Sequence, residues 1–184
     1  MSERRMENDA GIEMTFAVNH LGYFLTTNML LDVLKQTPSS RIVVVASDAH
    51  FSGQIDMDNL MHENDYRGFS VYCDSKLANL LFTYQLAGRL KDTTTTVNAV
   101  HPGVIKTKFG VSDRNSDGTF VWGKISPEEG AKASVYLSAS EKINGVSGKY
   151  FNQMQPEPSS AQSYEMDLAS QLWNKSLELT QLRI

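Results

Sequence analysis

Two residues with acid–base chemistry, Tyr72 and Lys76, stand four positions apart in an apolar run that is typical of a helix. Residues i and i+4 share one face of a helix, so the phenol would lie beside the ammonium group. A free phenol has a pKa near ~10, and a neighbouring cation lowers that pKa. The spacing therefore predicts a tyrosine that acts as a general acid or base near neutral pH. Because most such pairs are a core tyrosine and a solvated lysine, the motif needs support from other residues.

Three further features could belong to the same site. Ser47 follows the apolar run 43–46, at the C-terminal end of a predicted strand, where open α/β sheets gather their chemistry. The alternative is a serine that only satisfies local backbone groups. Asn19 lies inside a predicted apolar helix, where asparagine is unfavourable, so it is either functional or a buried amide bonded to a neighbouring helix. Pro102-Gly103, after a second strand, by itself indicates only a sharp turn.

The elements that would position these residues alternate between helices and strands. A short, continuous β-branched run predicts a strand at 41–46, and such a run is typical of a parallel strand covered on both faces. Two further strands are predicted at 95–100 and 147–151. Helices are predicted at about 12–35, 70–90 and 126–140, and at the C-terminal end. The helix at 12–35 is apolar around most of its circumference and is expected to be buried. This order predicts an α/β fold with a parallel sheet in three α/β/α layers.

Composition limits the functional classes. The chain has 184 residues, enough for one buried core, with 41% apolar and 21% charged residues. A formal charge of −4 without a Lys/Arg run argues against a nucleic-acid surface. No membrane span or signal segment is expected, and the single cysteine, Cys73, suits a reducing cytoplasm, the predicted location. Cys73 is expected to be a packed thiol, and the four histidines lack metal-ligand spacing, so no metal site is expected.

In this order, the features resemble the short-chain dehydrogenase/reductases, and within them the retinol-dehydrogenase-like branch. The matching runs are 16–26 around Asn19, 41–50 around Ser47, 72–81, 98–107 and 148–151. The resemblance implies the C-terminal part of a Rossmann-like, doubly wound parallel sheet. Residues 1–184 would then form a single truncated domain, with an N-terminal loop (1–11), a catalytic core (12–152), and a linker with a C-terminal helix (153–184).

The resemblance also implies a catalytic tetrad and a nicotinamide-binding turn. Tyr72 would exchange a proton with the substrate oxygen, Lys76 would lower its pKa and hold the nicotinamide ribose, and Ser47 would orient the substrate oxygen. Asn19 would distort its helix and hold a water that connects Lys76 to solvent. The implied reaction is hydride transfer between NAD or NADP and an alcohol or carbonyl compound. The residues expected at the nicotinamide, besides Tyr72 and Lys76, are Pro102, Gly103, Ile105 and Thr107.

The Gly-rich TGxxxGxG turn that this family places after its first strand does not occur in this sequence. The run Asn8 to Gly11 is not equated with the family's NNAG motif, because no strand precedes it and Gly11 lies only eight residues before Asn19. By the family's order the first four strands are absent, and the strand at 41–46 would expose an edge to other chains. Two alternatives stay open: a truncated non-catalytic product that acts through association, and an epimerase-type relative, against which the Pro102-Gly103 turn argues.

The substrate is only partly indicated. The segment 108–126 is expected to cover the pocket, and its apolar side chains indicate an apolar ligand, although packing roles are equally open; these are Phe109, Phe120, Val121 and Trp122. The choice between NAD and NADP stays open. Association between copies is also open, because the helices at 12–35 and 70–90 form the dimer face in many members of the family.

Overall fold

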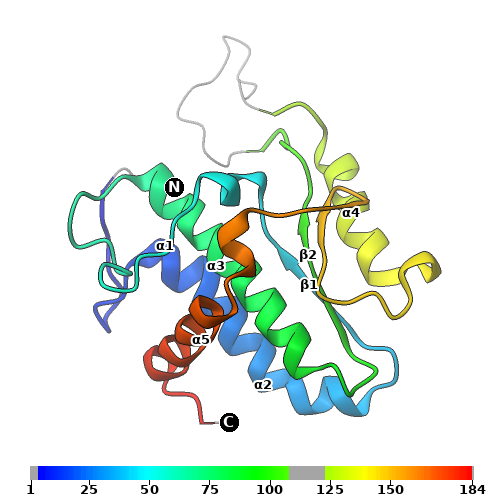
Figure 1. Cartoon of the computed structure of the whole chain (residues 1–184). Helices are drawn as coiled ribbons and strands as arrows, with labels where there is room; N and C mark the ends of the chain where they lie inside the picture. Colours follow the sequence, from blue (N-terminus) through cyan, green and yellow to red (C-terminus); the bar gives the residue numbers. More distant parts are fainter. Residues whose placement is uncertain (1–3, 108–122, 184) are drawn as a thin grey trace.

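The computed structural model describes residues 4–107 and 123–183. The apolar side chains predicted to cover the pocket therefore lie outside the described residues, so that prediction stays untested. Within the described ranges the chain forms one sheet with helices on both of its faces (Figure 1).

The sheet has four strands in the order β1-β2-β3-β4. Its members are β1 (Arg41–Val45), β2 (Thr96–His101), β3 (Tyr150–Asn152) and β4 (Gln155–Glu157). The β1–β2 and β2–β3 pairs are parallel, as predicted. Among the described residues β1 pairs only with β2, so the open edge expected at this strand is present.

Strand β4 was not predicted, because Pro156 indicated a linker. The strand pairs antiparallel with β3, and Pro156 lies opposite Phe151. A proline cannot donate to a ladder, but it is tolerated on an edge strand, where one row of N–H groups has no partner strand. The prediction of a linker at these residues was therefore wrong, while the parallel core of the sheet was predicted correctly.

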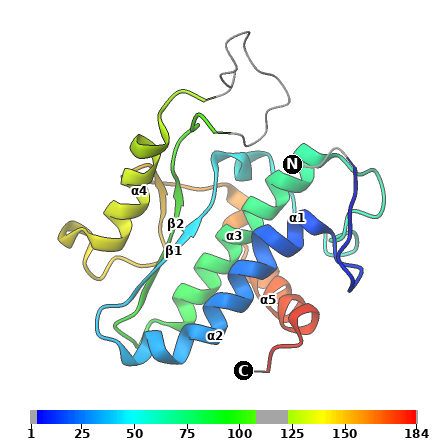
Figure 2. The ribbon, with the colours of Figure 1, turned by 180° about the vertical axis from the view of Figure 1, so that it is seen from behind.

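The helices divide into two layers. The helices α1 (Met14–Phe16), α2 (Gly22–Gln36), α3 (Gly68–Arg89) and α5 (Met166–Thr180) lie on one side of the sheet, and α4 (Pro127–Ala139) lies on the other (Figure 1). Figure 2 shows the same division from behind. The predicted three-layer α/β/α architecture is confirmed. None of the helices described is long and apolar enough to cross a bilayer.

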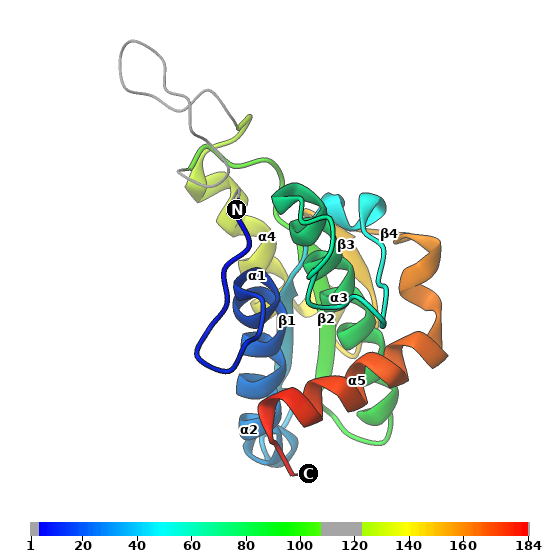
Figure 3. The same ribbon diagram turned by 90° about the vertical axis from the view of Figure 1, so that its left-hand side faces the viewer.

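Helix α3 is the centre of the first layer. Its apolar stripe predicted from the sequence is buried, with Leu77, Leu80 and Leu81 at 0% exposure. On one side the helix packs against the sheet, and on another α5 runs across it (Figure 3). Trp173 of α5 stacks on Phe82 of α3, with ring centroids 5.8 Å apart. The helix that carries the candidate acid–base pair is thus held by packing along its length.

The helix predicted at 12–35 is not buried all round. Phe16 and Phe24 face inward and are buried, but several apolar side chains of the same helix are at least half exposed: Val18, Met29, Leu30 and Val33. Helix α2 lies next to β1, the edge strand of the sheet, so only one of its sides meets other elements. The apolar residues around the helix predicted burial on every side. They could not show that the side facing away from β1 meets no other element in the described structure.

Candidate active site

A cavity of about 530 Å³ lies where β1 and β2 end. The carboxyl ends of neighbouring parallel strands meet at one edge of a sheet, which is where ligands bind in open α/β folds. The cavity is lined by every site residue predicted from the sequence: Asn19, Ser47, Tyr72, Lys76, Pro102, Gly103, Ile105 and Thr107. Segments far apart in the sequence therefore converge as expected.

Ser47 stands two residues after β1 and is the N-cap of a short 3₁₀ helix, η2 (Asp48–Ser52). Its Oγ accepts a hydrogen bond of 3.1 Å from the backbone N–H of Ala49. The Ser47 side chain is also hydrogen bonded to the phenol of Tyr72. The serine therefore satisfies local backbone and also contacts the predicted acid–base residue, while its role at a substrate oxygen stays a prediction.

Tyr72 and Lys76 share one face of α3, as their spacing predicted. The Lys76 Nζ lies 5.5 Å from the centroid of the Tyr72 ring. It donates a hydrogen bond of 3.1 Å to the carbonyl oxygen of Val45, at the end of β1. Both residues are buried, at 9% and 8% exposure respectively. The ammonium group is thus fixed between its own helix and the strand that leads to Ser47.

The electrostatics differ from the prediction. Burial raises the pKa of Tyr72, Cys73 and Tyr23 raise it further, and the hydrogen bond from Ser47 acts in the lowering direction. Burial also lowers the pKa of Lys76 to about 8. The expected lowering of the Tyr72 pKa was wrong in sign because it counted the charge of Lys76 and not the desolvation of either group.

Asn19 lies in a π-helical turn, Ala17–Leu21, that interrupts the helix between α1 and α2. This agrees with the distortion that the family resemblance implies, and single π turns are frequent at functional sites. The Asn19 Nδ2 donates to Ser75 Oγ at 3.0 Å, and that hydroxyl donates to the Tyr72 carbonyl oxygen at 2.7 Å. Asn19 is therefore bonded to a neighbouring helix and also lines the cavity, while its role in holding a water stays a prediction.

The turn after β2 requires a glycine. Gly103 has φ +94°, and a Cβ at this position would lie 2.8 Å from Ile125 Cδ1 and 3.0 Å from Gln153 Nε2. A side chain would therefore combine backbone strain with two close contacts. The turn is held by Gln153, the residue after β3, whose N–H donates to the His101 carbonyl oxygen at 2.7 Å. The cavity wall at this point is consequently backbone.

Two lining residues with titratable side chains were missed as site residues in the sequence. Asp48 and His101 follow or end the two parallel strands, and His101 Nε2 lies 3.4 Å from Asp48 Oδ2. Their positions in the sequence could have indicated them, because each stands next to a predicted site residue near a strand end. Nothing in the local pattern showed that their side chains meet.

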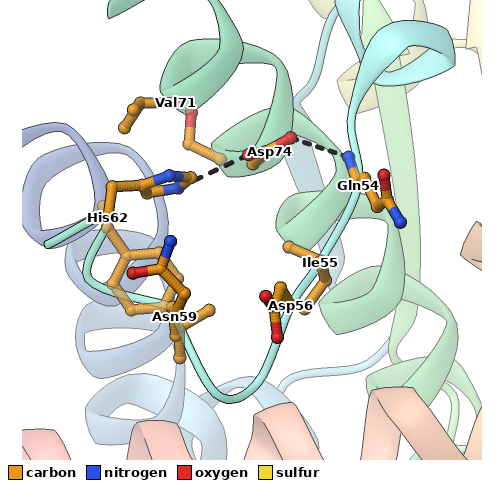
Figure 4. Close-up of a pocket in the computed structure, with 10 residues that line it drawn as sticks. Gln54, Ile55, Asp56, Asn59, His62, Val71 and Asp74 are labelled. Atoms are coloured by element: carbon orange, nitrogen blue, oxygen red, sulfur yellow. Dashed lines mark hydrogen bonds and ion pairs between the residues drawn. The ribbon is translucent and has the colours of Figure 1, made fainter. Parts of the chain in front are cut away.

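A second histidine–aspartate pair lies on another face of α3, in a pocket of about 10 Å³, room for about one water (Figure 4). His62 Nε2 lies 3.4 Å from Asp74 Oδ2, and Asp74 Oδ1 accepts from the Gln54 N–H at 2.7 Å. Burial raises the pKa of Asp74, and the bond from Gln54 and the charge of His62 act in the lowering direction. This pair ties the loop before α3 to the helix.

Two other buried residues are packing groups. Cys73 is 1% exposed, and burial raises the pKa of its thiol, which agrees with the predicted packed thiol. His20 is 1% exposed, bonds Ser176 Oγ at 2.9 Å, and burial lowers its pKa to about 4. Among the described residues, no cluster of three or more His, Cys, Asp or Glu side chains could hold a metal ion.

Comparisons with known proteins give one family. The sequence pattern described as short chain dehydrogenase matches residues 2–117. Human retinol dehydrogenase 14 is 41% identical over 178 residues, which are 93% of this chain and 53% of that protein. Human retinol dehydrogenase 13 is 41% identical over 182 residues, with 94% and 55% covered. The chain therefore spans about half the length of the curated relatives it matches.

The fold is matched as well. A crystal structure of an uncharacterized protein from Mycobacterium paratuberculosis is similar to this chain with a TM-score of 0.77 and 27% identity. The match covers 98% of this chain and 63% of that one. Together with the sequence relatives, it confirms the retinol-dehydrogenase-like resemblance and the Rossmann-like α/β fold predicted from the sequence.

Proposed function

Because this chain belongs to the short chain dehydrogenase family, we propose that it carries the proton-transfer half of a nicotinamide-dependent oxidoreductase site. The reaction is hydride transfer between NAD or NADP and an alcohol or carbonyl compound. One observation carries the proposal: Asn19, Ser47, Tyr72 and Lys76 come from three separate segments and line a single cavity.

Tyr72 is the proposed proton donor and acceptor. Since burial raises its pKa, the phenol is protonated at neutral pH and is in the form that donates a proton to a carbonyl oxygen during reduction. The Ser47 hydroxyl, which bonds the same phenol, is placed to hold that oxygen. The two hydroxyl groups would therefore share one substrate atom.

The residues fit a nicotinamide nucleoside. The ammonium group of Lys76 has three hydrogens, and the Val45 carbonyl accepts one of them, so a ribose hydroxyl would be a further acceptor. Gly103 places bare backbone at the wall where the carboxamide would lie. The proposed contacts of the turn are Pro102, Gly103, Ile105 and Thr107. When bound, the nicotinamide supplies or receives the hydride.

The proposed substrate is apolar. Much of the cavity wall is aliphatic or aromatic, from Val45, Ala46, Ala49, Phe69 and Val104. Retinol is the first probe, because the relatives at 41% identity are named as retinol dehydrogenases. A small number of polar groups in an apolar cavity is the usual arrangement of a small-molecule site.

The first experiment is a titration of the purified chain with NADH and with NADPH, followed by nicotinamide fluorescence. We expect binding, and turnover of retinaldehyde to retinol in its presence. Tyr72→Phe should lower turnover by about 10²–10⁴-fold and leave cofactor binding within about threefold. Tyr136→Phe on α4, whose side chain does not line the cavity, is the matched control and should change neither quantity.

Two outcomes would decide against this proposal. Full turnover in Tyr72→Phe would remove the assigned role of the phenol. No binding at millimolar cofactor would remove autonomous catalysis and leave a non-catalytic product that acts through association with other chains. The open edge of β1 and the exposed apolar side of α2 are the surfaces that such association would use.

We retain a cytoplasmic location as part of the proposal. It rests on the single cysteine, which suits a reducing compartment. Imaging of a tagged chain tests it, and a membrane-bound or secreted pool would contradict it.

A further inference from the structure

Asp48 and His101 connect the two turns that form the cavity edge. Asp48 directly follows Ser47, and His101 directly precedes Pro102. The strands before them are hydrogen bonded, since the Ala46 N–H donates to the Val100 carbonyl oxygen at 2.8 Å. Beyond that last backbone bond, the polar contact of 3.4 Å between His101 Nε2 and Asp48 Oδ2 continues the link through side chains.

The third strand joins the same carboxylate. The Tyr150 hydroxyl on β3 donates to Asp48 Oδ1, so each carboxylate oxygen meets a different strand. Tyr150 is 1% exposed, and burial together with Asp48 raises its pKa, so it stays a donor at neutral pH. Asp48 is therefore tied to the last residue of β2 and to the first residue of β3.

The neighbouring ring of His50 stabilises the same corner. Its Nδ1 lies 2.6 Å from the Ser47 carbonyl oxygen, and its Nε2 accepts from the Ser160 N–H at 3.1 Å. The ring also packs edge-on against Tyr150, with centroids 4.8 Å apart. The segment that carries the Ser47 hydroxyl is thus anchored on both sides of Asp48.

We propose that Asp48 and His101 are a positioning pair that holds the Ser47 turn and the Pro102-Gly103 turn as one unit. This inference rests on the proposed function, because it assigns the pair to the placement of the substrate oxygen relative to the nicotinamide. Neither residue is given a step in the chemistry. Their effect is on how well the groups that do the chemistry are ordered.

The contact between Asp48 and His101 can be followed through the pKa of His101, because the charged groups around this histidine shift that pKa. Burial lowers the pKa of His101, whereas Asp48 and Glu157 raise it. His50 and Tyr150 are the other titratable groups at this corner. Removal of the Asp48 charge should therefore lower the pKa of His101 further, by about half a pH unit or more.

The test compares Asp48→Asn with Asp74→Asn, which removes the carboxylate of the other pair with the same N–O distance, outside the cavity. Proton NMR of the histidine rings follows the pKa, and amide hydrogen exchange follows Ala49 and Gln153. These amides donate to Ser47 Oγ and to the His101 carbonyl oxygen. We expect Asp48→Asn to lower the pKa of His101 and speed exchange at both amides about tenfold, and Asp74→Asn to change neither.

Where turnover is measurable, Asp48→Asn should lower kcat about tenfold and change KM by less than about threefold. An unchanged His101 titration, or a changed titration with unchanged amide exchange, would overturn the proposal. If Asp48→Asn does not fold, His101→Asn breaks the pair from the other side and exchange at Ala49 gives the same decision. The NMR readouts need no cofactor, so a failure of cofactor binding would reject the proposed function without deciding this one.

Discussion

Two histidine–aspartate pairs of this chain have the same separation, 3.4 Å, and lie in opposite kinds of surroundings. His101 and Asp48 border a cavity of about 530 Å³, and the Asp48 side chain is 48% exposed. His62 and Asp74 enclose a pocket of about 10 Å³, and both side chains are less than 20% exposed. The same pairing therefore occurs once beside the large cavity and once at the small pocket. We call the small pocket around His62, Asp74 and Gln54 the filled corner.

The difference shows that pair geometry alone does not identify a functional site. In the filled corner, both carboxylate oxygens of Asp74 are used, by the Gln54 N–H and by His62 (Figure 4). The pocket of about 10 Å³ leaves no room for a ligand larger than a water. In the cavity, the pair stands between the ends of two parallel strands and beside Ser47. Free volume and position at the carboxyl edge of the sheet are what separate the two.

The largest effect on the free energy of unfolding is expected at Gly53, which directly precedes Gln54 of the filled corner. A Cβ there would lie 2.6 Å from the Cys73 carbonyl oxygen and 3.0 Å from Leu77 Cβ, and backbone atoms of α3 cannot move aside easily. Gly53→Ala should therefore lower the free energy of unfolding by about 3 kcal/mol, measured by urea denaturation. The same substitution at Gly88, which lies inside α3 and has nothing within 4 Å of an added Cβ, should stabilise the chain by up to about 1 kcal/mol. Equal effects at the two glycines would show that the corner is not tightly packed.

A smaller effect is expected at Lys76 in the cavity, where a cation is buried with little compensation. Its pKa of 10.5 in an unfolded chain falls to about 8 in the fold. Burial of the protonated lysine lowers the free energy of unfolding. This penalty is absent above pH 10.5 and grows as the pH falls towards 8, so the stability of the fold rises with pH between these values. Between pH 7.5 and 9.5 the stability of the parent chain should thus rise by about 2 kcal/mol relative to Lys76→Met, measured by urea unfolding at both pH values. Parallel profiles of the two chains would mean that Lys76 is not desolvated.

The smallest effect is expected at His62, in the filled corner. Its φ of +50° favours a residue that tolerates the left-handed region, so His62→Asn removes the ion pair while it keeps the backbone. We expect a change of about 0.5 kcal/mol in unfolding free energy, because a partly exposed pair contributes little. The His101 titration should not move. A shift there would show that the two corners communicate through α3, and the comparison between them would fail.

Much of the site was accessible from the sequence because its signals are local. The i, i+4 spacing of Tyr72 and Lys76 decides that they share a helix face, and the position of Ser47 after an apolar run places it just beyond the end of a strand. The helix start at α4 was equally local, since Ser126 Oγ caps the Glu129 N–H at 3.2 Å with Pro127 as the first helical residue. Such features depend on neighbours along the chain.

Other features depend on residues that are distant in sequence, and these were missed or wrong in sign. The pKa of Tyr72 is raised because several elements together remove water from it. The pairing of Asp48 with His101 joins residues 53 positions apart. The exposed side of α2 reflects which neighbours the helix has, and not its composition.

By itself, the sequence determined the alternation of strands and helices, the helix face shared by the tyrosine and the lysine, and the strand ends at which Ser47 and Pro102 stand. Only the tertiary structure decided which of these groups meet, how far each is removed from water, and which histidine–aspartate pair has space beside it. The physical reason is that periodicity and capping act over a few residues. Desolvation, volume and pairing across strands exist only after distant segments have packed together.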